Sequence, residues 1–287
     1  MNCTNEFIVE KEYTLFEYLL ENIKNKSKNN IKSLLINKCV SVNNIIITNH
    51  NFKLRKKDKI VVYNKQIRNK FYNINIIYED KNTIVVDKPS SLLSIGTDKE
   101  KNITAYKLVM DYLKQKNKNN KIFVVHRLDK DTSGVLMFAK NENVKNLYQD
   151  NWNELVKKRE YLGIIEGTVK DKTGTIKNYL KEDNFNKVYV SDNKNGKLAI
   201  TNYKLLKTNN KFSLLEININ TGRKNQIRVH MSETLKPIVG DKKYGSKINP
   251  IKRLGLHAYM LKVIDPLDKK EKEFVSPIPI EFINLFK

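Results

Sequence analysis

The sequence is poor in several features that would each indicate a particular class of protein. It has only two cysteines, Cys3 and Cys39, which lie far apart without the spacing of a metal site, so we expect a reducing compartment and no metal. No apolar run approaches the roughly 18 residues that a membrane-spanning helix needs. The amino terminus also lacks the basic start and apolar stretch of a secretory signal. These absences predict a cytoplasmic protein with no membrane partner.

Arginine is the scarce basic residue. Lysine and arginine together number 54, and only seven of them are arginines. Lysine suffices where only a positive charge is needed, whereas the planar guanidinium offers several donors in a fixed geometry. We therefore expect the arginines to mark positions that need this geometry: Arg55, Arg68, Arg127, Arg159, Arg223, Arg228 and Arg253.

Positive charge is what the sequence has in excess. The 287 residues carry a formal charge of +23, and 40% of them are apolar, so wholesale disorder is excluded. Lysines that replace the counterions of phosphates release these ions to solvent, which favours a polyanionic partner such as RNA. A lysine-rich coding bias would give the same charge, so composition alone leaves both interpretations open.

Residues 1–65 are predicted to form a small domain. Apolar residues recur at helical spacing over 16–23 and 31–35, and short strands are predicted at 40–42 and 45–47 around a tight turn, with 54–63 closing the unit. The helix pair followed by CVSVNN resembles the S4-like RNA-binding domain. Asn44 stands where that family has glycine, and asparagine tolerates the positive φ of such a turn. The alternative is a small α+β cap without an RNA-binding role.

A basic linker is expected at 64–72, followed by a second domain over 73–287. Strand patterns dominate this part, and helical patterns are interspersed among them. This mixture predicts an α+β catalytic domain with an extended antiparallel or mixed sheet flanked by helices. The expected strands are 74–78, 83–86, 122–125, 135–139, 162–165, 187–190, 199–206 and 212–219, and the expected helices are 105–114, 144–156, 225–233 and 280–286.

The segment KIFVVHRLDKDTSGVLMFAK is the most informative one in the chain. An apolar strand leads into His126-Arg127-Leu128-Asp129, a turn follows, and a second apolar strand begins after Gly134. An acidic residue held in a short turn between two buried strands has little freedom, as a catalytic group requires. Asp129 could equally be a turn former, since aspartate favours turns through bonds to nearby backbone amides.

This segment resembles the signature of RluA/RluD-type pseudouridine synthases. Further segments resemble that family's motifs in family order: DKPSSLLSI, KKREYLGIIEGTV, INTGRKNQIRVHM, PIVGDKKYG and RLGLHAYML. The resemblance extends over residues 74–287. Ser91 replaces a glycine of the family, Arg159 stands at its basic position, and Gly163 stands at its alanine.

The resemblance implies that uridine in RNA is isomerised to pseudouridine. The base is flipped into a pocket, detached from the ribose, turned and rejoined through carbon, and no cofactor is expected because nothing is oxidised. The implied carboxylate is Asp129, acting as a nucleophile at the anomeric carbon or as a base toward the 2′ position. Arg228 would pair with it and favour its charged form, and Tyr161 would stack on the base and relay the proton from C5.

The resemblance also implies which residues bind RNA. Arg127 would fill the gap left by the flipped base or clamp a phosphate, and Arg223, Lys224 and Asn225 are expected to contact the RNA. Lys224 and Asn225 replace the threonine and histidine that are common in the family. Because asparagine does not titrate, we expect no proton transfer at this position.

Three of the four histidines lie in these motifs. The spacing of His126, His230 and His257 fits no set of metal ligands, and no cysteine or carboxylate completes one. We expect these side chains to make hydrogen bonds in the core.

Several alternatives stay open at this point. The chain could be a non-catalytic RNA-binding or ribosome-assembly factor on the same scaffold, although such a factor would not need the acid at position 129. A glycoside hydrolase using Asp129 and Asp131 is disfavoured, because the two carboxylates lie in one turn and the charge does not suit a neutral sugar. The substrate is expected to be ribosomal RNA of the large subunit rather than transfer RNA, and the protein is expected to be a monomer.

Overall fold

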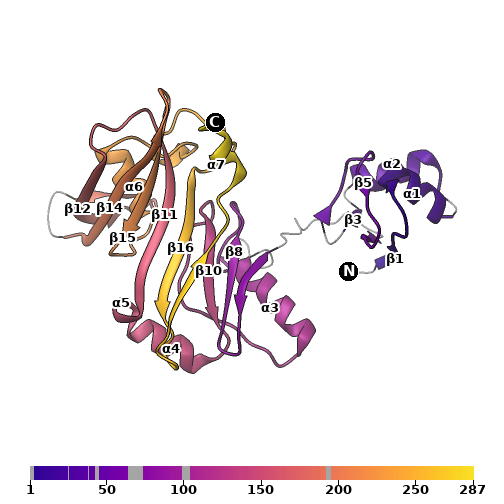
Figure 1. Ribbon diagram of the computed structural model, residues 1–287, viewed down its shortest axis with the longest axis horizontal. Helices are drawn as coiled ribbons and strands as arrows, with labels where there is room; N and C mark the ends of the chain where they lie inside the picture. Colours follow the sequence, from indigo (N-terminus) through magenta and orange to yellow (C-terminus); the bar gives the residue numbers. More distant parts are fainter. Residues whose placement is uncertain are drawn as a thin grey trace. The chain divides into compact units, whose positions relative to one another are not determined.

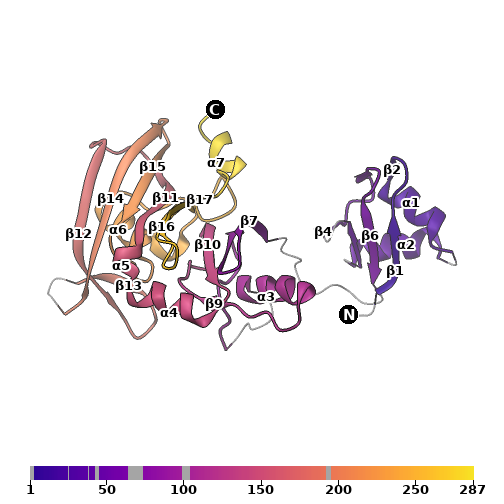
Figure 2. The same cartoon turned by 60° about the horizontal axis from the view of Figure 1, so that its bottom comes forward.

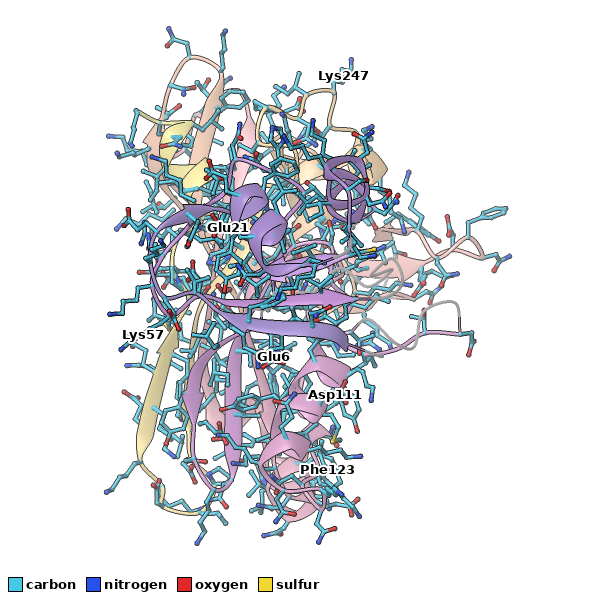
Figure 3. All side chains as sticks on the ribbon, turned by 90° about the vertical axis from the view of Figure 1, so that its right-hand side faces the viewer. Glu6, Glu21, Lys57, Asp111, Phe123 and Lys247 are labelled. Atoms are coloured by element: carbon cyan, nitrogen blue, oxygen red, sulfur yellow. The ribbon has the colours of Figure 1, made fainter. Side chains whose placement is uncertain are left out.

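The computed structural model describes residues 3–24, 26–37, 39–42, 45–63, 74–98, 104–191 and 195–287. The chain divides into two compact units, residues 1–73 and 74–287. The linker expected at 64–72 lies outside the described residues. Exposed charged side chains cover both units, among them Glu6, Glu21 and Lys57 of the first and Asp111 and Lys247 of the second (Figure 3).

The first unit packs two helices against a four-stranded sheet with the strand order β1-β6-β3-β4, and β2 pairs with β5 in a small second sheet. Its apolar core includes the fully buried Leu15, Leu19 and Ile31 from the two helices. The elements are β1 Cys3–Ile8, β2 Tyr13–Thr14, α1 Leu15–Asn22, α2 Lys28–Ile36, β3 Val40–Val42, β4 Ile45–Ile46, β5 Lys53–Leu54 and β6 Lys59–Tyr63.

Local chemistry explains where the elements of this unit begin. Thr14 and Glu17 form a reciprocal capping box at the start of α1, and Ser27 caps α2. The predicted hairpin is confirmed by the pairing of Val42 with Ile45, while its turn residues lie outside the described ranges. The interpretation of two helices followed only by strands is wrong, because β1 precedes them and pairs with β6. The polar segment CTNEFI gives little strand signal.

The second unit is built on an eleven-stranded sheet, whose main path runs β13-β12-β14-β15-β11-β16-β10-β8-β7. The β10–β16 pair is parallel, so the sheet is mixed, as predicted. Its strands are β7 Asn75–Glu79, β8 Thr83–Lys88, β9 Phe123–Val124, β10 Ser133–Ala139, β11 Val156–Glu166, β12 Thr173–Glu182, β13 Val188–Ser191, β14 Lys197–Thr208, β15 Phe212–Ile219, β16 Leu256–Ile264 and β17 Glu271–Val275. Figure 1 shows β12, β14, β15, β11, β16, β10 and β8 side by side in this order.

Helices cover both faces of this sheet (Figures 1 and 2). One face of β10 packs Met137 against α4, and the opposite face packs Phe138 against Tyr106 of α3. Further along the sheet, α6 covers the side of β11 that carries Tyr161, and α7 covers the side that carries Leu162. The helices are α3 Ala105–Lys116, α4 Glu142–Asp150, α5 Trp152–Leu155, α6 Gln226–Thr234 and α7 Ile280–Asn284, with a short 3₁₀ helix η1 at Lys242–Tyr244. No helix in the described part of the chain is long and apolar enough to cross a membrane.

Three local expectations are corrected. The helix expected over 144–156 is α4 and then α5, and the chain turns into β11 at Val156. Strands β16 and β17 were not predicted. Strand β12 was also missed, because its inward positions include Gly174, which packs against the Tyr203 ring, and Asn178, which bonds His230. A strand whose core face contains glycine and asparagine lacks the usual apolar alternation.

Candidate active site

All seven residues that the sequence indicates as a site line one cavity of about 1050 Å³ in the second unit. They come from the loop before β10, from β11, from the segment that leads into α6, and from α6 itself. The seven are Arg127, Asp129, Tyr161, Arg223, Lys224, Asn225 and Arg228. Of the six arginines that the structure describes, four line this cavity, since Arg159 does so as well.

The loop that carries Asp129 is fixed by the segment after β8. The Ser94 hydroxyl donates to the Leu128 carbonyl (2.7 Å) and accepts from the Leu128 amide (3.0 Å). Ser90 donates to the Asp131 carbonyl at 2.8 Å. The residues on both sides of Asp129 are therefore held from one segment, which restricts the carboxylate to a narrow range of positions.

Lys88 completes this attachment from inside the core. Its ammonium group donates to the carbonyls of Pro89 (3.0 Å), Leu92 (2.8 Å) and Lys130 (3.0 Å). The residue is fully buried. Burial is the strongest influence on its pKa and lowers it to about 7. The nearby carboxylates of Asp131 and Asp129 have the opposite effect and raise it. The three carbonyls use all three donors of the ammonium, so this lysine joins the two motif segments rather than facing substrate.

Arg228 lies between two carboxylates. Its Nε and Nη2 atoms each donate to one oxygen of Asp241 at 2.7 Å, a bidentate pair in which the Asp241 side chain is only 1% exposed. Its Nη1 atom lies 3.7 Å from Oδ2 of Asp129. The tight pair with Asp241 sets the plane of the guanidinium, and the remaining nitrogen, Nη1, lies near both Asp129 and the side chain of Asn225.

Asp129 experiences opposing influences on its charge. Burial raises the pKa of its carboxyl group above the ordinary value, while Arg228 and then Lys88 lower it. The side chain remains 33% exposed. The carboxylate is therefore both reachable from the cavity and more basic than a solvated aspartate, as a nucleophile or a general base requires.

Tyr161 and Arg159 stand two residues apart on β11. Burial raises the pKa of Tyr161 to about 12, so its hydroxyl stays protonated near neutral pH. Arg159 donates from Nη2 to the Asn220 carbonyl at 3.0 Å and lies over the Trp152 ring, 5.9 Å from its centroid. It packs directly on Gly222, where a Cβ atom would come within 2.7 Å of its guanidinium. These contacts shape the wall of the cavity next to the tyrosine.

Asn225 connects the guanidinium to η1. Its side-chain oxygen accepts from Nη1 of Arg228 at 3.0 Å, and its amide donates to the Tyr244 hydroxyl at 3.1 Å. The residue precedes α6 with φ +53°, a left-handed conformation that asparagine adopts more readily than most residues. Its amide is thus already engaged within the protein.

The other predicted RNA-binding residues lie at the rim. Arg127 is exposed while its neighbour Leu128 is buried. Arg223 is also exposed and donates from Nε to the Leu198 carbonyl at 2.9 Å. Lys224 forms an ion pair with Glu182 and donates to Asn186 at 3.2 Å.

The three motif histidines make hydrogen bonds in the protein interior, as expected. Nε2 of His126 accepts from the Met137 amide at 3.1 Å, and burial lowers the pKa of this ring to about 4. His230 bonds Thr201 and Asn178, and His257 bonds Ser133. Within the described ranges, no group of three or more His, Cys, Asp and Glu side chains could hold a metal ion.

Sequence reasoning assigned no role to three residues that fix this site: Lys88, Arg159 and Asp241. Each lies in a segment that resembles a family motif, and Arg159 also belongs to the small set of arginines. Their functional importance comes from contacts across the fold, such as the 42-residue separation between Lys88 and Lys130. The scarcity of arginine could have indicated a role for Arg159. Nothing in the local sequence distinguishes Asp241 from a turn former.

Comparison with known proteins agrees with this geometry. A sequence profile described as RNA pseudouridylate synthase matches residues 82–233, more than half of the chain. The chain is 36% identical over 218 residues to ribosomal large subunit pseudouridine synthase D of Borreliella burgdorferi, covering 73% of this chain and 67% of that protein. It is 34% identical to ribosomal large subunit pseudouridine synthase C of Rickettsia felis, covering 82% and 78%. The solved structure of human RNA pseudouridylate synthase domain containing 4 superposes with a TM-score of 0.60 at 25% identity, covering 73% of this chain and 90% of that one.

The family profile, the similar proteins and the cavity define an enzyme that modifies RNA. The chain belongs to the RNA pseudouridylate synthase family and is an RNA pseudouridine synthase.

Proposed function

We propose that this enzyme isomerises uridines of large-subunit ribosomal RNA, with the carboxylate of Asp129 as the reacting group. The observation that carries the proposal is the position of Asp129, which lines the cavity 3.7 Å from a guanidinium that Asp241 holds in place. The names of the Borreliella and Rickettsia relatives support ribosomal RNA as the substrate class. The reaction takes place in the cytoplasm, and the enzyme acts as a monomer.

The isomerisation balances without any other reactant. The bond between N1 of uracil and C1′ of ribose breaks, the base turns, and C5 becomes bonded to C1′. C5 loses its proton and N1 gains one. Asp129 begins this sequence by attacking C1′ or by removing the proton at the 2′ position. Arg228 keeps the carboxylate ionised in the desolvated cavity.

Tyr161 and Arg127 have separate roles in this proposal. Tyr161 lies in the same cavity, and its ring stacks on the flipped uracil. Its protonated hydroxyl takes up the C5 proton as its own proton passes to water. Flipping the base out of a helix costs a few kcal/mol of stacking. The exposed guanidinium of Arg127 offsets part of this cost by occupying the vacated position in the RNA.

The remaining predicted residues divide into contact and positioning roles. Arg223 and Lys224 are exposed at the rim and bind phosphates. The two hydrogen bonds of Asn225 support a positioning role for its side chain, because they orient Arg228. The first unit acts as an S4-like RNA-binding domain, which its pair of capped helices and the pairing of Val42 with Ile45 support.

Pseudouridine mapping across total RNA, in cells with and without this protein, tests the proposal. The expected result is the loss of pseudouridine at one or more uridines of large-subunit ribosomal RNA. Loss confined to transfer RNA would favour the alternative substrate. An unchanged map, with purified protein that still binds RNA, would favour a non-catalytic assembly factor on the same scaffold.

A further inference from the structure

The hairpin between β12 and β13 presents an exposed aromatic side chain. Phe185 is 89% exposed, more than any other large apolar residue in the described ranges. It lies in the connection that follows Glu182 and precedes Val188, two residues that pair across the hairpin. A phenyl ring exposed at the end of a hairpin presents an apolar face on which a nucleic-acid base can stack.

The connection is rigid rather than loose. A carboxylate oxygen of Asp183 accepts from the amides of Phe185 (2.9 Å) and Lys187 (2.8 Å). The Asp183 amide in turn donates to the Lys187 carbonyl at 2.9 Å, and Asn186 takes up the turn at φ +61°. A partner that covers the Phe185 ring therefore does not have to order this backbone first.

Two lysines tie the hairpin to the rim of the active-site cavity. Lys224, which lines the cavity, donates to the side chain of Asn186 at 3.2 Å, and Lys243 donates to its carbonyl at 2.8 Å. At the base of the hairpin the Val188 amide donates to the Tyr244 hydroxyl at 3.2 Å. That hydroxyl also accepts from Asn225, which holds Arg228, so the hairpin and the catalytic guanidinium share one network.

A basic groove leads from the cavity to this hairpin. The groove has a volume of about 310 Å³ and shares Gly222, Arg223 and Lys224 with the cavity. Four cationic side chains line it, and its one acidic residue, Glu182, is paired with Lys224. The four are Lys181, Lys197, Arg223 and Lys224. Such a groove suits a phosphate backbone, and an exposed ring beside it suits a base.

We propose that the β12–β13 hairpin is a second RNA-binding element of this enzyme. The groove holds the phosphates of the nucleotides next to the target uridine, and Phe185 stacks on one of their bases. The proposal rests on the uridine-isomerising function of the adjacent cavity. It assigns to the hairpin a part of substrate affinity that is independent of the chemical step.

The test compares three substitutions of Phe185 on an unmodified transcript of large-subunit ribosomal RNA, with tritium release from 5-tritiated uridine as the assay. Phe185→Ala is expected to raise KM by roughly 5- to 150-fold, the range for losing one stacked base, with kcat within about twofold of the parent. Phe185→Trp restores the parent KM, whereas Phe185→Leu does not, because it keeps apolar area but has no ring face. An unchanged KM for Phe185→Ala, or equal rescue by leucine and tryptophan, would overturn the proposal.

Leu206→Ala is the matched control. Leu206 is 43% exposed and lies nine residues beyond Lys197 on β14, which is about 30 Å along an extended strand. It is expected to leave KM unchanged, and an increase equal to that of Phe185→Ala would count against the hairpin.

Binding measurements separate this proposal from the catalytic one. In an Asp129→Asn background no turnover occurs, so the Kd for the same transcript reports affinity alone. Phe185→Ala should weaken this Kd by the same factor as it raises KM. Lys181→Gln with Lys197→Gln should reduce the slope of log Kd against log salt by about one for each phosphate that is no longer neutralised. An unchanged Kd and an unchanged slope would exclude the hairpin from the RNA interface even if the enzyme isomerises uridine.

Discussion

The guanidinium of Arg228 makes its shortest contacts with Asp241, not with Asp129. Both bonds to Asp241 measure 2.7 Å, whereas the nearest approach to Asp129 is 3.7 Å. The bidentate pair is buried and fixes the orientation of the guanidinium. Arg228 therefore stabilises the negative charge of Asp129 without making a short hydrogen bond to its carboxylate oxygens. A carboxylate held in this way is charged and still able to react.

Asp241→Asn should therefore impair both stability and rate. Removing one charge of a buried pair leaves the other uncompensated, at a cost of about 3 kcal/mol in the free energy of unfolding. Arg228 also loses its orienting partner, so kcat should fall by roughly tenfold to a hundredfold. Thermal unfolding and single-turnover kinetics measure the two effects. Glu233→Gln, an exposed position on α6, is the control and should change neither, and an equally active Asp241→Asn enzyme would refute the positioning role.

The pH dependence of kcat/KM should have an acid limb that reports Asp129. The ionised form is required, and burial raises the pKa of this carboxyl above the ordinary value, so activity should fall as the pH drops through that raised pKa. Arg228→Gln removes the group that lowers this pKa, and the limb should move to higher pH. Arg223→Gln should lower kcat/KM equally at all pH values. A limb that stays in place in Arg228→Gln would contradict the electrostatic role.

Substitutions of Asn225 separate backbone strain from hydrogen bonding. Asn225→Ala and Asn225→Gly both remove the bonds to Arg228 and Tyr244, so kcat should fall to a similar degree in each. Only alanine is strained at φ +53°, and it should lower the free energy of unfolding by about 1 kcal/mol more than glycine does. Steady-state kinetics and urea unfolding provide the two readouts. If glycine retained full activity, the side-chain bonds would have no part in catalysis.

Two glycines near the site should respond differently to alanine. At Gly134, with φ +111°, a Cβ atom would lie 2.0 Å from the Ala258 carbonyl oxygen across the parallel β10–β16 pair, so Gly134→Ala should cost more than about 3 kcal/mol. At Gly163 the close atom is the flexible end of Ile217, so Gly163→Ala should cost less than about 1.5 kcal/mol. Chemical denaturation measures both costs. Comparable losses would mean that backbone contact does not decide the outcome.

The sequence allowed prediction of the parts of the site that lie within local motifs. Asp129 and Arg228 were predicted from short segments that resemble family motifs, and the structure brings them together. Asp241 could not be predicted as the partner of Arg228, because that contact depends on where the loop before η1 packs. Lys88 likewise gains its position from carbonyls on two loops.

The fold shows the same division between local and long-range information. The mixed sheet followed from many short apolar runs, whereas β12 was missed because glycine and asparagine face its core. Since β12 forms one side of the hairpin that carries Phe185, the groove beside the cavity could not be predicted either. These features depend on contacts between distant segments rather than on local periodicity.

A single-turnover assay of Asp129→Asn tests the central claim most directly. The raised pKa means that the ionised carboxylate lowers folding stability at pH values above it, so the asparagine variant should unfold at a higher temperature than the parent at pH 7. A higher unfolding temperature and an unchanged Kd for the transcript would establish that the variant is folded and binds. The account predicts that this folded, RNA-bound variant forms no pseudouridine over the time in which the parent completes a turnover. Pseudouridine formed by Asp129→Asn at a rate near that of the parent would contradict it.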